Sequence, residues 1–286
     1  MNKAASATQT TIIQCLINGM SLRAICRTTG VSMGTVLRLL EEAGQFCAGY
    51  HCLRMRSLAT VRVEADEQWS FCGAKARNAS QPGHGDLWTF AAIDADSKLV
   101  ISYLVGARNA ENTYAFVGDL AQRVAGRIQL STDGWGLYTG AVRHAFGFAR
   151  CDYAQIVKKY AMPDVEGQRR YSPPVCTGVL KVRMIGRPDP AKISTSYVEN
   201  LNLSTRQHCK RFARLTIAHS KKQENHAHAV ALNFFAHNFI RVHTTLSKER
   251  KAKTTPAMAS GLTTRPWTVE DIISMMDPRT PLGMVA

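Results

Sequence analysis

Three acidic residues, Asp66, Asp133 and Glu199, are the side chains whose type and spacing best suit a chemical step. They stand 67 and 66 residues apart, so only the tertiary fold can bring them together. Carboxylate oxygens are the ligands that Mg²⁺ prefers, and two such ions can assist the displacement of an oxygen at a phosphate. If the three side chains converge, we expect a metal site for phosphoryl transfer.

Glu67 directly follows Asp66 and is the alternative first acid. Side chains on a strand alternate between its two faces, so Asp66 and Glu67 should point in opposite directions. Only one of them should then face the metal ions. The alternation does not decide which one it is.

The elements that must position these acids follow from hydrophobic periodicity. Residues 60–69 alternate like a strand, and 87–106 read as two strands around a polar turn, which predicts an antiparallel meander. The pattern then predicts helix 111–126, strand 127–135, helix 136–147, strand 151–160 and helix 196–212. This order predicts an α/β fold with a mixed sheet, in which Asp66 and Asp133 end strands and Glu199 lies on a helix.

Three sequence blocks, ADEQWSFCGAKARN, TDGWGLY and VENLNLSTRQH, contain these acids in order. They resemble the catalytic motif blocks of the insertion-sequence-one (IS-one) transposases, a DDE group with an RNase H-like fold, and the similarity covers residues 60–245. The resemblance implies that Asp66, Asp133 and Glu199 are the catalytic and metal-ligating triad, with Glu67 as a possible alternative acid. It also implies two Mg²⁺ ions, for which Mn²⁺ can substitute.

The activity implied by the resemblance is cleavage of double-stranded DNA at the terminal inverted repeats of an insertion sequence, followed by transfer of the 3′ ends to target DNA. Pairing two DNA ends implies a homo-oligomer, at least a dimer on DNA. Two alternatives stay open. One is a domesticated helix-turn-helix regulator with an inactive core, and the other is an RNase H-like nuclease that does not join ends.

Two basic residues follow Glu199 on the predicted helix. Arg206 comes seven residues later, nearly two helical turns, so both side chains project from one face. Lys210 extends that face. A guanidinium fits phosphate well, and we therefore expect Arg206 and Lys210 to contact DNA, the alternative being a solvated basic face.

Residues 10–46 read as short helices around a turn. Gly30 marks the turn and Ser32 is placed to cap the next helix, a pattern that resembles a helix-turn-helix. The second helix would present Met33, Thr35 and Arg38 to DNA. The alternative is a generic helical pair without a DNA role.

The complete interpretation is an RNase H-like mixed-sheet catalytic core of the α/β class, preceded by an all-α helix-turn-helix domain. The expected boundaries are 1–48 for the helix-turn-helix domain, 49–59 for a linker, 60–250 for the catalytic domain with an insertion at 161–193, and 251–286 for a C-terminal tail.

The charge of the chain supports a polyanionic partner. Its 286 residues contain 36 Lys and Arg against 21 Asp and Glu, a net charge of +15. Residues 58–160 carry 11 basic and 10 acidic residues, whereas 194–250 carry 9 and 3. The sequence contains no apolar run long enough for a membrane span and no export signal at its start, so we expect a cytoplasmic protein associated with a bacterial or archaeal nucleoid.

Overall fold

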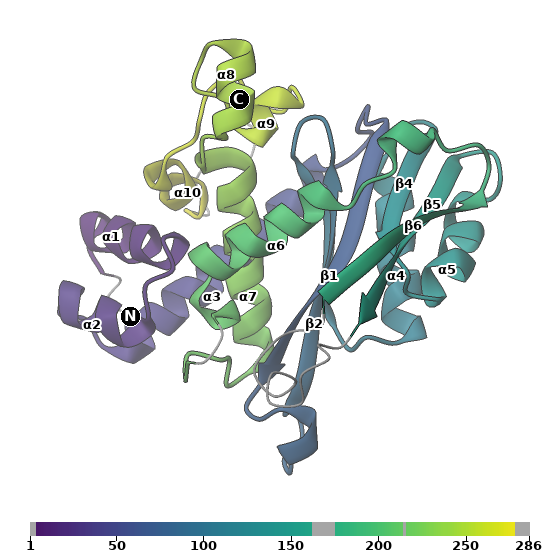
Figure 1. The fold of residues 1–286 in the computed structure, drawn as a ribbon. Helices are drawn as coiled ribbons and strands as arrows, with labels where there is room; N and C mark the ends of the chain where they lie inside the picture. Colours follow the sequence, from purple (N-terminus) through teal and green to yellow (C-terminus); the bar gives the residue numbers. More distant parts are fainter. Residues whose placement is uncertain (1–3, 162–174, 214–215, 278–286) are drawn as a thin grey trace.

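A mixed sheet of six strands lies at the centre of the structure, a computed structural model that describes residues 4–161, 175–213 and 216–277 (Figure 1). The strands lie in the order β3-β2-β1-β4-β5-β6. Their bounds are β1 Arg62–Cys72, β2 Gly85–Asp94, β3 Val100–Gly106, β4 Ile128–Asp133, β5 Cys151–Ala161 and β6 Val175–Ile185.

The sheet contains three antiparallel and two parallel pairs of neighbouring strands. β1, β2 and β3 form the expected antiparallel meander. β4 then pairs in parallel with β1 on one side and with β5 on the other, and β6 closes the edge antiparallel to β5. The predicted mixed α/β sheet is therefore confirmed.

Helices cover both faces of this sheet. Their bounds are α1 Ser6–Ile17, α2 Leu22–Thr29, α3 Met33–Arg54, α4 Ala110–Arg123, α5 Leu137–Phe146, α6 Ser196–His208, α7 Gln223–Phe235, α8 Thr244–Arg250, α9 Pro256–Ala259 and α10 Val269–Met275.

The alternation of apolar residues in β2 explains why both faces are covered. Phe90 belongs to the core formed with α4 and α5, and its ring centroid lies 5.5 Å from that of Phe116. The next residue, Ala91, belongs to a second core together with Val198 of α6 and Phe234 of α7. Because adjacent side chains point to opposite faces, the continuous apolar run from Phe90 to Ile93 needs a helical layer on each side of the sheet.

Residues 49–54, which the sequence assigned to a linker, continue α3 as far as Arg54. The helix continues past residue 48 because its apolar face does not end there. Cys47 and Tyr50 are buried, and the Tyr50 ring packs edge-on against Phe239 and Trp267. The division of the chain into domains stays a prediction.

The region beyond residue 250 is folded wherever the structure describes it. α10 lies within the expected C-terminal tail, and it begins with a capping box between Thr268 and Asp271. It contacts α1 (Figure 1). Chain segments near both ends therefore pack against one another.

Part of the expected insertion 161–193 is the edge strand β6, and residues 162–174 lie outside the described residues. Gly178 lies within β6, where it pairs with Lys159 of β5 next to a shift in the register of the two strands. Within the described residues, no helix is both long and apolar enough to cross a membrane.

Two glycines of α3 test whether the helix packs as described. A Cβ at Gly44 would lie 2.4 Å from the Cβ of His228 on α7, whereas a Cβ at Gly49 meets nothing within 4 Å. Alanine is favoured over glycine inside a helix by about 1 kcal/mol, so we expect Gly49→Ala to raise the melting temperature by about 2 °C. Gly44→Ala should lower it despite the same gain in helix propensity. If thermal unfolding shows both variants stabilised, α3 does not pack closely on α7.

Candidate active site

A cavity of about 500 Å³ contains all three predicted acids in its lining. Asp133 ends β4 and Glu199 lies in the first turn of α6, as expected, but Asp66 lies within β1 and not at its end, because the strand continues to Cys72. The parallel register pairs Ala65 with Thr132, so the next residue on each strand is one of the acids. The tertiary fold therefore brings the three side chains together across the separations in sequence.

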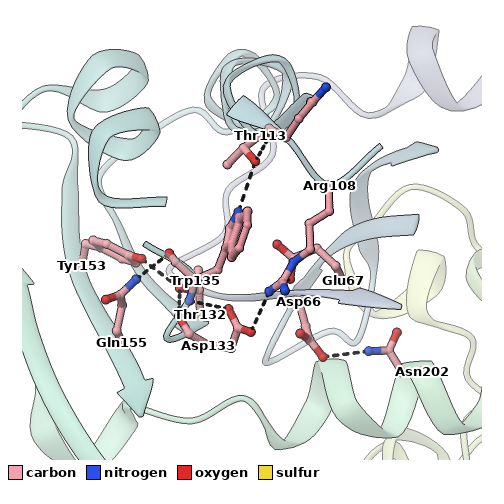
Figure 2. Close-up of polar contacts among 11 residues, drawn as sticks. Asp66, Glu67, Arg108, Thr113, Thr132, Asp133, Trp135, Tyr153, Gln155 and Asn202 are labelled. Atoms are coloured by element: carbon pink, nitrogen blue, oxygen red, sulfur yellow. Dashed lines mark hydrogen bonds and ion pairs between the residues drawn. The ribbon is translucent and has the colours of Figure 1, made fainter. Parts of the chain in front are cut away.

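Hydrogen bonds hold the two strand acids in place. The side-chain amide of Asn202, on α6, donates to Asp66 Oδ2 over 2.9 Å (Figure 2). The backbone N–H of Trp135 donates to Asp133 Oδ1 over 3.0 Å. The second oxygen of Asp133, Oδ2, lies 3.4 Å from Arg108 Nη2.

Glu199 is held by its own helix and by the neighbouring strand. Thr195 Oγ1 donates to Glu199 Oε1 over 2.7 Å, and Lys158 Nζ of β5 lies 2.6 Å from the same oxygen. The Glu199 side chain is 44% exposed, so this ion pair is at the open side of the cavity.

Glu67 lies close to the other acids but is not part of the cavity lining. Carboxylate oxygens of Asp66, Glu67 and Asp133 all lie within 4.8 Å of one another. Glu67 itself is only 7% exposed, and its Oε2 lies 3.4 Å from Arg108 Nη2. It therefore points to the opposite face of β1 from Asp66, although the strand is narrow enough to keep the charges near each other.

This crowding raises the pKa values of two acids. Burial raises the pKa of Asp66 to about 6, and the nearby charge of Asp133 adds to the shift. Burial also raises the pKa of Glu67 to about 8, again with a contribution from Asp133, while Arg108 opposes the shift. Clustered carboxylates whose charged forms are disfavoured fit a divalent cation, because a bound cation offsets their repulsion and hard cations prefer oxygen ligands.

Arg108 is a site residue that the sequence reasoning missed. Its guanidinium carbon lies 3.9 Å from the ring centroid of Trp135, and its Nη2 lies 3.4 Å from both Glu67 Oε2 and Asp133 Oδ2 (Figure 2). The ring centroid of Trp88 lies 4.9 Å from the same carbon. The only signal in the sequence is a basic residue two positions after the third predicted strand. Nothing local indicates that it reaches the acids.

The two basic residues predicted after Glu199 do not lie in this cavity. Arg206 is half-buried on α6, and neither Arg206 nor Lys210 belongs to the lining. Lys210 does not extend the face of the helix as predicted, because α6 ends at His208 and Lys210 begins a separate 3₁₀ turn. Buried Cys209 interrupts the helix between them.

The predicted DNA-reading residues lie at the start of α3. Gly30 adopts the left-handed conformation with φ of 71°, and Ser32 caps α3 by accepting a bond from the backbone N–H of Thr35. Met33, Thr35 and Arg38 are all partly exposed there. The helices and the turn match the sequence pattern, and contact with DNA stays a prediction.

Comparison with known proteins identifies relatives of the segment that holds two of the acids. Residues 59–166 match the model of a family described as IS1 transposase. The chain is 30% identical over 102 residues to the insertion element IS1 4 protein InsB of Escherichia coli (strain K12), which is 35% of this chain and 54% of that protein. It is 29% identical to the IS1 protein InsB of Shigella sonnei, covering 35% of this chain and 69% of that protein. The resemblance to IS-one transposases is confirmed, and the chain covers about half the length of the E. coli relative.

Solved structures give a weaker likeness. Two crystal structures of Mos1 complexes, a strand transfer complex and a pre-cleavage transpososome, have TM-scores of 0.24 and 0.26. Their identities are 16% and 12%, over 54% and 82% of this chain and 58% and 78% of the Mos1 chains. These scores are too low to support an argument about the fold.

The raised pKa of Glu67 predicts how the stability of the metal-free protein depends on pH. The folded chain keeps the Glu67 proton up to about pH 8, whereas the unfolded chain releases it near 4.5. The free energy of unfolding should therefore fall as the pH rises through that window, and Glu67→Gln should remove this contribution. Thermal unfolding in a chelator between pH 5 and 8 measures it, with Glu111→Gln on exposed α4 surface as the matched control. Parallel pH profiles for Glu67→Gln and the unaltered chain would contradict the assignment.

Proposed function

We propose that this chain, whose residues 59–166 match the IS1 transposase family, is a DDE transposase that cleaves DNA strands at terminal inverted repeats and transfers the 3′ ends to target DNA. The observation that carries the proposal is the cavity lined by Asp66, Asp133 and Glu199, three acids from three separate elements. The sheet order, with an antiparallel meander followed by parallel β4 and β5, supports the RNase H-like core that such an enzyme would use.

Asp66, Asp133 and Glu199 would hold two magnesium ions, for which manganese can substitute. Bound ions supply the positive charge that activates the attacking oxygen and stabilises the leaving oxygen in an in-line displacement. The exposed position of Glu199 leaves one side of the cavity open to a DNA strand. Asp66, held by Asn202, lies on the buried side of the cavity.

Arg108 contacts Asp133, and Lys158 contacts Glu199. Arg108 is stacked on two tryptophans, which limits its movement, and we propose that it keeps Asp133 in place. Lys158 pairs with the more exposed acid, Glu199, and is placed to contact a phosphate of the DNA strand. Arg206 and Lys210 would contact DNA away from the reacting phosphate.

The start of α3 is the element that we propose recognises the inverted repeats. The capped first turn offers partly exposed Met33, Thr35 and Arg38, and it follows the turn that separates α3 from α2. Such a helix fits the major groove. Because cleavage would pair two ends, the working form would contain at least two copies of the chain on DNA.

Asp133→Asn tests the chemistry. This substitution keeps the shape of the side chain but removes a negative charge, so we expect Mg²⁺-dependent cleavage and 3′-end joining to fall by about 10³-fold or more. Binding to duplex DNA from the regions flanking the gene should stay unchanged. Asp96→Asn, in the turn between β2 and β3, is the matched control and should retain activity. Specific binding without any cleavage by the unaltered chain would instead support a regulator with an inactive core.

Arg38→Ala tests the proposed recognition of the inverted repeats by α3. We expect its dissociation constant for the flanking duplex to rise about tenfold, as for the loss of a single good contact, without a change in Mg²⁺-dependent nicking of unrelated DNA. Arg54→Ala removes the same charge from the other end of α3 and should bind normally. Electrophoretic mobility shifts measure both, and equal losses in the two variants would show that α3 acts only through its charge.

A further inference from the structure

Three polar side chains on one face of β1 contact the start of α6. Glu64, Asp66 and Gln68 alternate along the strand and therefore point to the same side. Glu64 Oε2 accepts bonds from the backbone N–H groups of Tyr197 at 2.7 Å and Val198 at 3.1 Å. The side chains of Asp66 and Gln68 both contact a single residue further along α6.

That residue is Asn202. Its side-chain amide donates to Asp66 Oδ2 over 2.9 Å, and its backbone carbonyl accepts a bond from Gln68 Nε2 over 3.0 Å. Gln68 is 2% exposed and Asn202 6%, so these bonds are shielded from water. We call the whole set of contacts made by Glu64, Asp66 and Gln68 with α6 the β1–α6 seam.

Glu64 does for α6 what a capping residue usually does. The N-cap residue Thr195 makes no side-chain cap, and its hydroxyl instead bonds Glu199. The first N–H groups of a helix have no partner within the helix, and a carboxylate near them is favoured by the helix dipole. Glu64 supplies that carboxylate from a strand 133 residues away in the sequence, and it is 3% exposed.

We propose that Glu64 is a positioning residue of the proposed active site, because it fixes the first turn of α6 and thereby the position of Glu199 relative to Asp66. This inference rests on the proposed function. Tyr197 and Val198 immediately precede Glu199, so bonds to their N–H groups locate its backbone. Glu64 is not one of the acids that line the cavity. Its Oε2 instead accepts the two backbone N–H bonds of α6.

Two conservative variants separate the effect of the charge of the Glu64 side chain from the effect of its length. Glu64→Gln keeps the length of the side chain and an oxygen that can accept both bonds. Glu64→Asp keeps the charge but is one methylene shorter, so it reaches α6 only if the helix moves. If the bonds position Glu199, Glu64→Gln should behave like the unaltered chain and Glu64→Asp should not.

The readout is Mn²⁺ binding to the full-length protein, measured by electron paramagnetic resonance at a temperature at which circular dichroism shows every variant folded. Loss of a residue that orients a metal ligand typically weakens metal binding by 10- to 100-fold, so we expect a loss of that size in Glu64→Asp. Glu199→Gln should weaken the same site. Asp271→Ala removes a capping carboxylate from remote α10 and should lower thermal stability without changing Mn²⁺ affinity.

Each outcome decides one question. Weaker Mn²⁺ binding in Glu64→Asp, with normal binding in Glu64→Gln and Asp271→Ala, supports the positioning role. Normal binding in Glu64→Asp, or a loss in Glu64→Gln as large as that in Glu199→Gln, overturns it. If the unaltered chain binds no Mn²⁺ at all, the proposed function is wrong. That result differs from the one that overturns the positioning role of Glu64, in which the unaltered chain binds Mn²⁺.

Discussion

Repulsion among carboxylates in a half-buried place is the constraint on which the rest of the site depends. Oxygens of Asp66, Glu67 and Asp133 lie within 4.8 Å of one another, and burial together with the charge of Asp133 raises the pKa of both residues on β1. Such an arrangement persists only where cations or donors offset the repulsion. Arg108 does so from one side, and the proposed ions would do so from the other.

The charge of the chain is unevenly distributed around the site. Residues 58–160 are nearly neutral because their basic residues, including Arg108 and Lys158, balance the acids there. The excess positive charge lies before residue 58 and after residue 160. Under the proposed function, DNA would be held mainly by the basic outer segments, while the acidic centre would be left to bind cations. A uniformly basic surface would not separate these two tasks.

The sequence predicted the elements better than their ends. Alternation and helical periodicity placed every strand of the meander and α5 correctly, since these patterns depend only on local burial. They failed at the end of α3, where burial of Tyr50 continues the helix to Arg54, and at the end of α6, where the helix stops at His208. Both ends depend on packing against distant elements, which a local pattern does not record.

For the site, the sequence by itself determined the kinds of acid, their order and the strands or helix that carry them. It left open whether Asp66 or Glu67 faces the cavity, and it gave no sign of Arg108 or of the bonds from Glu64 to α6. Those were decided by the parallel register of β1 with β4 and by the docking of α6 on β1. The physical reason is that periodicity fixes the face on which a side chain lies, whereas its partner is chosen only when two distant elements pack together.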